Sequence, residues 1–544
     1  SASTNAEIYN KGNISVSGSH YCLYVGGLFG YVASSLTTGE NSGLVTIEPN
    51  TTMDSYLMVG GACAWFNNNL TDVKNSGAVT ISEGVSAVRN TYISGCAAYS
   101  ETTTNGVIAQ RLSNEGSVLV NGTYSAKINL AGCLGFWSEN TEKQYLRGAD
   151  NYGPITANVV CHGSEMCAGG VVCYMRCNGS RGLHNHKSGT INLNVTTTTG
   201  KIAVGGIAYG LRHQLSAAVE GESVNGNDAD IILTGSSATT FDVGGIICLP
   251  NNYHRYDAYN KGNITITGAE VGTDLRVGGS EANHNYGKTV RNYYNAGNIT
   301  VDATTKVQGS VYIGGLSGGE SLLAYDAAPH NFENCYNSGN IKFSGEAGLS
   351  GTGVVKMGGA LACFVDTDSY DPTLTFTNGF TNSGSVTFNG VLRSEGGEVY
   401  MGGLIGELTL GTRDCSSWSG DVIVSGNVLC NGTCKGKYHV GGVIGETNKS
   451  FANGVVFGNL EVMDEQGAGM LTATPRSESI VVSNFKVGGC VRIFNTLDEG
   501  YVTTPLNADN FYNYLYGGST DWTGATDYDG CTYISALPAV TTAE

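Results

Sequence analysis

Two stretches of this 544-residue chain are nearly identical: YNKGNISVSG at residues 9–18 and YNKGNITITG at residues 259–268. A single catalytic site does not need a second copy of its loop, whereas a chain that turns repeatedly needs the same turn at every corner. The same pattern, an N-x-G turn followed by a short alternating strand, recurs along most of the sequence. Its clear copies begin at residues 10, 41, 75, 114, 151, 260, 295, 337 and 382.

A second element, an apolar residue followed by a Gly pair or a close variant of it, comes after each turn at a variable distance. Its copies are VGGLFG at 25, VGGACA at 59, AGCLGF at 131, VGGIAYG at 204, VGGIIC at 243, IGGLSGG at 313, MGGALA at 357, MGGLIGE at 401, VGGVIGE at 440 and VGGCVR at 487. About thirteen units of roughly 31–45 residues can be traced, which is the period of a solenoid.

The residues after each turn alternate in polarity. In the copy at 259–268, Ile264 and Ile266 alternate with Thr265 and Thr267, as in a strand with one buried face. We expect the Asn and Gly of the turn to be kept because a corner needs positive φ, which Gly supplies and Asn tolerates. The sequence therefore predicts an all-β fold, a right-handed parallel β-helix (β-solenoid) of about 13 coils.

Residues 1–493 carry the repeats, and residues 494–544 form an aromatic, irregular segment that we interpret as a C-terminal cap. A cap is expected because an exposed last coil recruits other chains. The first residue is Ser1 rather than Met, and a repeat begins within ten residues of it. We therefore expect a processed or trimmed chain whose first coil either follows an upstream domain or serves end-to-end self-assembly.

Composition limits the classes of partner. The chain has 80 Gly, 8 Pro, 14% charged residues and a formal net charge of −18. Nucleic acids and anionic membranes need a clustered basic face, so neither is an expected partner. There is no apolar run of 18 residues, so no membrane-spanning segment is predicted.

The 16 cysteines are spread over the chain, and many follow a Gly pair inside an apolar run, where cysteine acts as a small buried hydrophobe. We expect this of Cys63, Cys96, Cys133, Cys173, Cys248, Cys363 and Cys490. Cys430 and Cys434, in CNGTC, could close a small disulfide loop, with free thiols as the alternative there.

Four of the Gly-pair elements read GLFG (27–30), GLSG (315–318), GLIG (403–406) and GVIG (442–445), interleaved with N-x-G-x-[IV]-x-[IV]. They resemble the GLUG-motif repeats, over residues 9 to about 493. The resemblance implies a secreted or surface protein of bacteria, Bacteroidota among them, in which the repeats serve as a stalk or adhesive module. The chain departs from this pattern at residues 186–189 and 224–228.

The sequence contains two kinds of candidate metal ligands, acidic clusters and a group of soft donors. The acidic clusters are Asp366, Asp368 and Asp371; Asp228 and Asp230; and Asp521, Asp527 and Asp529. None has the closing Glu of a complete calcium loop, so no cofactor is predicted and calcium alone is kept open. The densest soft donors are Cys161, His162, Cys167, Cys173, Cys177, His184 and His186, whose spacing fits no zinc-finger pattern closely.

No G-x-S-x-G, H-E-x-x-H, P-loop or dinucleotide motif occurs in a usable context, so no catalytic, cofactor-binding or metal residue is assigned and no enzyme is predicted. We expect a non-catalytic, extracellular or outer-cell-surface bacterial β-solenoid: an adhesin, stalk or filament subunit that presents variable loops, such as residues 344–356 and 389–399.

Its expected partners are other surface proteins, host glycans or copies of itself. Two alternatives stay open. One is a surface glycan-binding accessory protein using exposed aromatic residues, for which Tyr253, Tyr256, Tyr293 and Tyr294 are the candidates. The other is a β-helix polysaccharide lyase or hydrolase, which needs carboxylates converging on one outer face.

Overall fold

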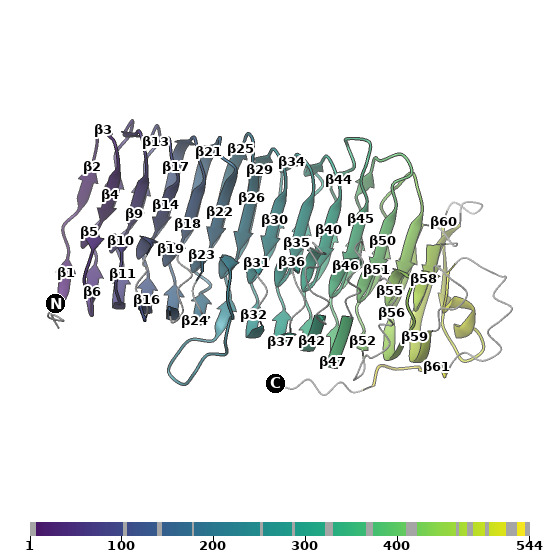
Figure 1. Ribbon diagram of the computed structural model, residues 1–544. Coiled ribbons are helices and arrows are strands. Elements are labelled where there is room, and N and C mark those ends of the chain that lie inside the picture. Colours follow the sequence, from purple (N-terminus) through teal and green to yellow (C-terminus); the bar gives the residue numbers. More distant parts are fainter. Residues whose placement is uncertain are drawn as a thin grey trace. The chain divides into compact units, whose positions relative to one another are not determined.

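The computed structural model describes residues 7–101, 106–138, 144–176, 179–250, 254–284, 289–320, 330–365, 374–409, 422–463, 467–475, 482–495, 500–517 and 530–538. The chain is an all-β parallel β-helix, as the repeats predict (Figure 1). Its contacts form two compact units, Ser1–Arg276 with Ser280–Asn283 and Val277–Gly279 with His284–Glu544.

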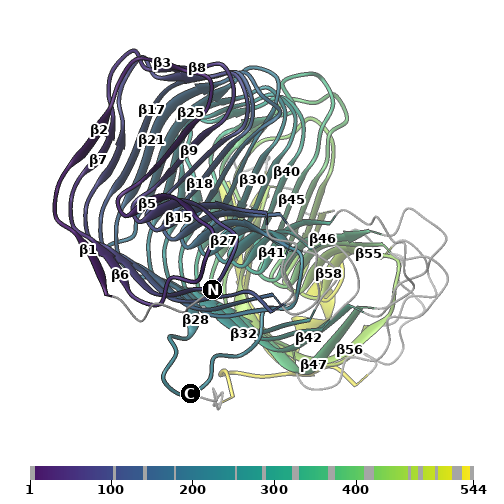
Figure 2. The same cartoon turned by 60° about the vertical axis from the view of Figure 1, so that its left-hand side comes forward.

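Each coil of the first unit adds strands to three parallel sheets, seen around the coils in Figure 2. The first sheet contains the strands that end on the repeat asparagine: β1 (Ile8–Asn10), β6 (Gly39–Asn41), β11 (Leu70–Asn75), β16 (Ile108–Asn114), β20 (Tyr145–Asn151), β24 (Gly179–Asn185), β28 (Asn225–Asn227) and β32 (Arg255–Asn260). It also contains the strands after the turn: β2 (Ile14–Val16), β7 (Val45–Ile47), β12 (Val79–Ile81), β17 (Val118–Tyr124), β21 (Ile155–Cys161), β25 (Ile191–Thr197), β29 (Ile231–Ser237) and β33 (Ile264–Ile266).

The other two sheets of the first unit flank the Gly pair. The second sheet contains β4 (Leu23–Gly26), β9 (Leu57–Gly60), β14 (Thr91–Ser94), β18 (Ile128–Ala131), β22 (Glu165–Gly169), β26 (Lys201–Gly205) and β30 (Phe241–Gly244). The third contains β5 (Phe29–Val32), β10 (Cys63–Phe66), β15 (Ala97–Ser100), β19 (Leu134–Trp137), β23 (Val172–Met175), β27 (Ala208–Leu211) and β31 (Ile247–Pro250). As predicted, Ile264 and Ile266 of β33 are fully buried between these sheets while Thr265 is half-buried.

The second unit repeats this plan. Its asparagine-bearing strands and their continuations are β37 (Thr289–Asn295), β42 (His330–Asn337), β47 (Leu374–Asn382), β52 (Val422–Val424), β56 (Phe451–Val462) and β59 (Val482–Asn495). The strands before and after its Gly pairs are β40 (Val311–Gly314), β41 (Ser317–Glu320), β45 (Val355–Gly358), β46 (Leu361–Val365), β50 (Val399–Gly402), β51 (Ile405–Thr409), β54 (Tyr438–Gly441), β55 (Ile444–Thr447), β57 (Ala468–Gly469) and β58 (Thr472–Pro475).

The repeat asparagines form a buried hydrogen-bonded ladder. In most turns the Asn amide donates one N–H to the carbonyl of the residue two positions on and the other to the amide oxygen of the next coil's Asn. Asn75, for example, reaches Gly77 at 2.7 Å and Asn114 at 2.9 Å. The same bonds link Asn10, Asn41, Asn75, Asn114, Asn151, Asn185, Asn227 and Asn260 in the first unit and Asn295, Asn337 and Asn382 in the second. This ladder holds successive turns in register.

The second glycine of each Gly pair leaves the space that a ladder asparagine side chain occupies. A Cβ on the second Gly of the pair, Gly61, would lie 2.3 Å from Cγ of Asn75 and 2.0 Å from the carbonyl oxygen of Gly95. The same clash with a ladder asparagine recurs at Gly27, Gly95, Gly132, Gly170, Gly206, Gly279, Gly315 and Gly359. The two repeated parts of each unit, the N-x-G turn and the Gly pair, therefore meet in space. The asparagine side chain explains why the facing residue is a glycine.

The physical reason that we gave for the N-x-G turn is wrong. Among the described residues, neither the ladder asparagines nor the glycines after them have positive φ. Gly77 is required because a Cβ there would lie 2.0 Å from the carbonyl oxygen of Gly43 in the preceding coil. Positive φ occurs instead at the bend before the ladder strand ends, as at Asp72, Arg111 and Asp257.

Three further expectations need correction. VGGC at 487–490 is no Gly-pair corner, because it lies within β59, where Gly488 pairs with Phe457 of β56. Cys490 is accordingly half-buried, not a core residue. The segments 344–356 and 389–399, which we expected to be loops, each contain a short strand, and these strands stack: Ala347 of β44 (Glu346–Ala347) pairs with Leu392 of β49 (Val391–Leu392).

The last described part of the chain departs from the coil pattern. β59 pairs in parallel with β56, but it pairs antiparallel with β60 (Gly500–Pro505). A short 3-10 helix, η2 (Phe511–Tyr514), follows, and β61 (Thr532–Tyr533) returns to β59. The chain therefore reverses direction within the segment 494–544, where we expected a cap.

Replacing one ladder amide should cost far more stability than replacing an exposed one. Asn114→Ala removes the bonds to Gly116 and Asn151 and leaves the Asn75 amide without its acceptor, all in a fully buried column. We expect a loss of about 2–4 kcal/mol, measured by urea unfolding followed by circular dichroism. The control is Asn158→Ala, an exposed residue for which we expect about 0.5 kcal/mol or less. Equal losses in the two variants would contradict the structural role of the ladder.

Candidate functional site

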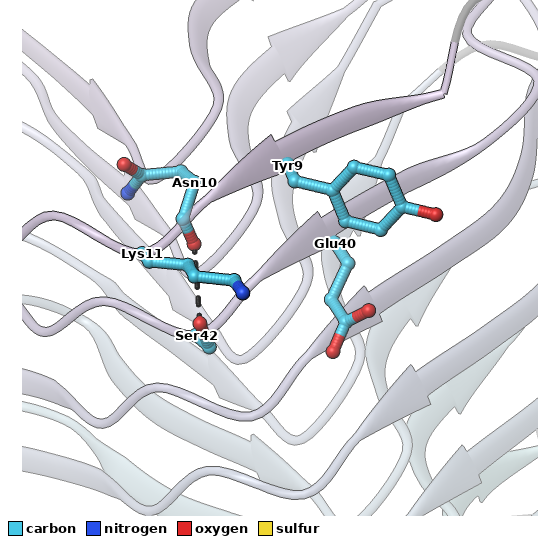
Figure 3. A pocket seen from close by; sticks show the side chains of 5 residues that line it. All are labelled: Tyr9, Asn10, Lys11, Glu40 and Ser42. Atoms are coloured by element: carbon cyan, nitrogen blue, oxygen red, sulfur yellow. Dashed lines mark hydrogen bonds between the residues drawn. The ribbon is translucent and has the colours of Figure 1, made fainter.

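The residues immediately before and after each ladder asparagine form two outward columns on the first sheet. They face outward because the asparagine between them points into the core. Figure 3 shows both columns at Asn10, where Tyr9 and Glu40 belong to the preceding column and Lys11 and Ser42 to the following column. These five side chains line a shallow hollow of about 400 Å³.

A diagonal pairing rule connects the two columns. The preceding residue of one coil contacts the following residue of the next coil, as in the ion pair between Lys74 and Glu115 at 2.9 Å. In the same way, Asp150 Oδ1 contacts His186 Nε2 at 2.8 Å. The next diagonal repeats it, with His184 Nε2 at 2.8 Å from Asp228 Oδ2.

Two consecutive diagonals bring four ionisable side chains together, and we name Asp150, His184, His186 and Asp228 the histidine–aspartate cluster. Its two imidazoles are stacked with their centroids 3.9 Å apart, and Tyr152 stacks on the other face of His186 at 3.9 Å. Side-chain exposures run from 13% at His184 to 27% at Asp228, so the cluster is shielded but open to small solutes. Burial lowers the pKa of His184 and so favours its neutral imidazole. The neighbouring carboxylate of Asp228 opposes this shift but does not cancel it.

A missing side chain lets a tyrosine join this cluster. In the preceding column His184 is followed by Gly226 and then by Tyr259. A Cβ on Gly226 would lie 2.3 Å from Cζ of Tyr259, so the ring occupies the space that a side chain would fill. The Tyr259 hydroxyl thereby reaches 3.2 Å from His184 Nε2 and 3.3 Å from Asp228 Oδ2.

A long segment between sheets borders the cluster. The segments between the third sheet and the next ladder strand differ in length: residues 67–69 form a short one and residues 212–224 a long one. The long segment stands out from the coils before β28 (Figure 1). From it, Ser223 donates a hydrogen bond to Asp150 Oδ1 at 2.6 Å. Glu222 accepts bonds from Arg181 at 2.8 and 3.0 Å, which fixes this end of the segment on β24.

The soft donors that are close in sequence do not form a single group. Among those that the structure describes, only His184 and His186 enter the histidine–aspartate cluster. Cys167 and Cys173 belong to a buried apolar cluster with Tyr209, and His162 contacts Thr198. Cys161 is buried, and Cys177 lies outside the described residues.

Of the acidic clusters, one is described. Asp228 joins the histidines, whereas Asp230 accepts bonds from the backbone and side-chain amides of Asn263 in the next turn. The two therefore do not share a site. The other two acidic clusters, which begin at Asp366 and Asp521, lie outside the described residues.

The cysteine predictions are largely confirmed. Cys63, Cys96, Cys133, Cys173, Cys248 and Cys363 are buried. Burial raises the pKa of Cys167 to about 12, so this thiol is protonated at neutral pH. Cys430 and Cys434 are thiols rather than a disulfide.

The tyrosines proposed for glycan contact do not form one platform. Tyr293 is fully buried, and Tyr294 stacks on Tyr336 at 4.7 Å. Tyr256 stacks on His254, and Tyr253 lies outside the described residues.

A different set of rings does line up, on the outward face of the third sheet of the first unit. We name Tyr31, Trp65, Tyr99, Phe136 and Tyr174 the aromatic stripe; successive centroids are 5.1–5.8 Å apart. The stripe occupies one register position on β5, β10, β15, β19 and β23. Trp65 is held by a bond from its indole N–H to Asn67.

Aligning the repeats on their asparagines could have revealed the cluster, because it places the cluster residues in adjoining columns. Aligning them on the second glycine of the Gly pair could have revealed the stripe, because each stripe residue comes four residues after that position. Sequence proximity alone hides them. No family model, curated protein or solved structure matches this chain. Among the described residues, no helix has the length and apolar character needed to cross a membrane.

The place of Tyr259 should depend on the glycine beneath it. Gly226→Ala puts a methyl group into the ring and should cost about 1–3 kcal/mol of stability. In a Tyr259→Ala background most of this cost should vanish, because the obstructing ring is gone. Urea unfolding of the wild type, both single variants and the double variant gives the coupling energy, and additive costs would contradict this packing.

Proposed function

We propose that this chain is a non-catalytic, extracellular or outer-cell-surface bacterial β-solenoid that serves as an adhesive or structural scaffold. The resemblance to GLUG-motif repeats supports this proposal. The observation that carries it is the division of the coil into parts that do not vary and parts that do. The ladder and the Gly pairs keep one geometry, while the segments between the third sheet and the next ladder strand change greatly in length.

This division suits a binding scaffold. Stacked coils hold the inserted segments in a column on a rigid support, so weak contacts repeated along the column add up. The segment 212–224 illustrates it, since Ser180 and Ser216 anchor its base by a backbone hydrogen bond of 2.8 Å. Its partners would be other surface proteins, glycans or copies of the chain itself.

The aromatic stripe favours a second candidate, a glycan-binding accessory protein. Sugar rings pack their apolar faces on aromatic side chains, and the stripe places rings at regular spacing, although Tyr99 at its middle is buried at 8% exposure. Tyr31 is 52% exposed and Tyr24, from the second sheet, lies beside Trp65 with 38% exposure, so the start of the stripe is the accessible part. A glycan of several sugar units would span several coils.

Retention of the purified chain on gels containing neutral or acidic polysaccharides tests binding. We expect Tyr31→Ala to weaken binding about tenfold or more, because accessible aromatic anchors carry much of such an interface. Tyr9→Ala is the matched control: its ring is 55% exposed and lies outside the stripe. Unchanged retention of Tyr31→Ala, or equal losses in both variants, would remove the stripe as the binding surface.

The same polysaccharides test the absence of catalysis. After incubation with and without calcium, we expect no new reducing ends and no unsaturated product, because a bound glycan should leave a scaffold unchanged. Product formation would contradict the proposal and favour the lyase or hydrolase alternative.

A further inference from the structure

The histidine–aspartate cluster has the donors, spacing and support of a metal site. We propose that the cluster binds one divalent transition-metal ion, with zinc as the expected occupant. This inference concerns a different sheet from the aromatic stripe and does not rest on the proposed function.

The spacing is close to what zinc needs. Donor atoms of Asp150, His184 and His186 all lie within 4.8 Å of one another. A tetrahedral zinc ion with bonds of about 2.0–2.1 Å holds its donors about 3.4 Å apart. Asp228 contacts His184 but lies outside this group, so its carboxylate would have to turn toward the ion to serve as the fourth ligand. The two imidazoles are stacked, and they would have to rotate out of the stack so that both Nε2 lone pairs converge on the ion.

The donor types favour a transition metal over calcium or magnesium. Two imidazole nitrogens with two carboxylates suit zinc, cobalt, nickel or copper, whereas calcium takes six to eight oxygen ligands. Two carboxylates also balance the charge of a divalent ion. On binding, a neutral imidazole that now shares its Nε2 proton with a carboxylate would change to the tautomer with the proton on Nδ1, which frees the Nε2 lone pair for the ion without net release of a proton.

The support is rigid, and the ligands have further partners. They come from three consecutive coils whose register is fixed by β20, β24 and β28 and by the ladder beneath. Ser223 contacts Asp150, and Tyr259 contacts His184 and Asp228. Such outer contacts orient ligands and tune affinity. A bound ion would therefore join three coils and the base of segment 212–224.

Cobalt(II) is the probe, because tetrahedral nitrogen and oxygen ligation gives visible d–d bands, whereas thiolate ligation adds strong near-ultraviolet charge transfer. The full chain, stripped with a chelator, is titrated with cobalt and the bands are then displaced with zinc. We expect one site per chain without thiolate bands. Asp150→Asn, Asp228→Asn and His186→Gln should each weaken binding at least about tenfold.

The substitutions by Asn keep the shape of the side chain and an acceptor for the imidazole, so these variants should retain the wild-type circular dichroism and melting temperature without metal. His162→Gln, a histidine of the same unit outside the cluster, should bind cobalt as the wild type does. Tyr259→Phe retains all four ligands and should weaken binding by up to about tenfold. The proposal is overturned by an absence of binding to the wild type at millimolar cobalt, by unchanged affinity in folded Asp150→Asn and Asp228→Asn, or by thiolate bands that Cys167→Ser removes.

Discussion

A buried column of asparagine amides is the interaction on which the rest of each unit depends. Each amide uses both of its N–H groups and its oxygen inside the protein, so a shift of register by one residue would strand three polar groups in the core. Hydrophobic burial alone does not fix the register of stacked Val and Ile strands as firmly, because neighbouring apolar residues are interchangeable. The ladder therefore sets the register, and the Gly pairs follow from the space that its side chains take.

The outward surface inherits this register. Because the asparagine points inward, its two neighbours point outward in every coil, and the coil-to-coil offset joins the preceding residue of one coil to the following residue of the next. Side chains that interact on this surface therefore come from paired positions of successive coils and not from one continuous stretch of sequence. The same register lines up the aromatic stripe on the third sheet, where each ring comes from an equivalent position.

The repeat predicted the fold class, the inward alternation of Ile264 and Ile266 and the burial of most Gly-pair cysteines, because period and alternation are local signals. It did not reveal why Asn and Gly are kept, since φ is local but the ladder and the carbonyl clash at Gly77 belong to neighbouring coils. The prediction of a Gly-pair corner at VGGC, 487–490, is wrong for the same reason. A motif of four residues does not distinguish a corner from the interior of a strand, and the structure places it within β59.

His184, His186 and Asp228 were candidates from the sequence, but Asp150 and the grouping of all four were missed, because these residues are close in space and not in sequence. Cys173 is eleven residues from His184 yet points into an apolar cluster, whereas Asp150 is separated from His186 by a full coil and contacts it. Strand alternation and stacking work against any search for ligands by short spacing. A search over equivalent positions of the repeat follows the geometry that the ladder imposes.

Two departures from the repeat coincide at this cluster. Gly226 gives up a side chain in the outward column, and the segment 212–224 adds backbone that must be ordered. Both end on the same groups, since Tyr259 passes over Gly226 to His184 and Ser223 reaches Asp150. The asparagine ladder continues through these coils without a break. Their common target is therefore better explained by a role of the cluster than by the stability of the solenoid.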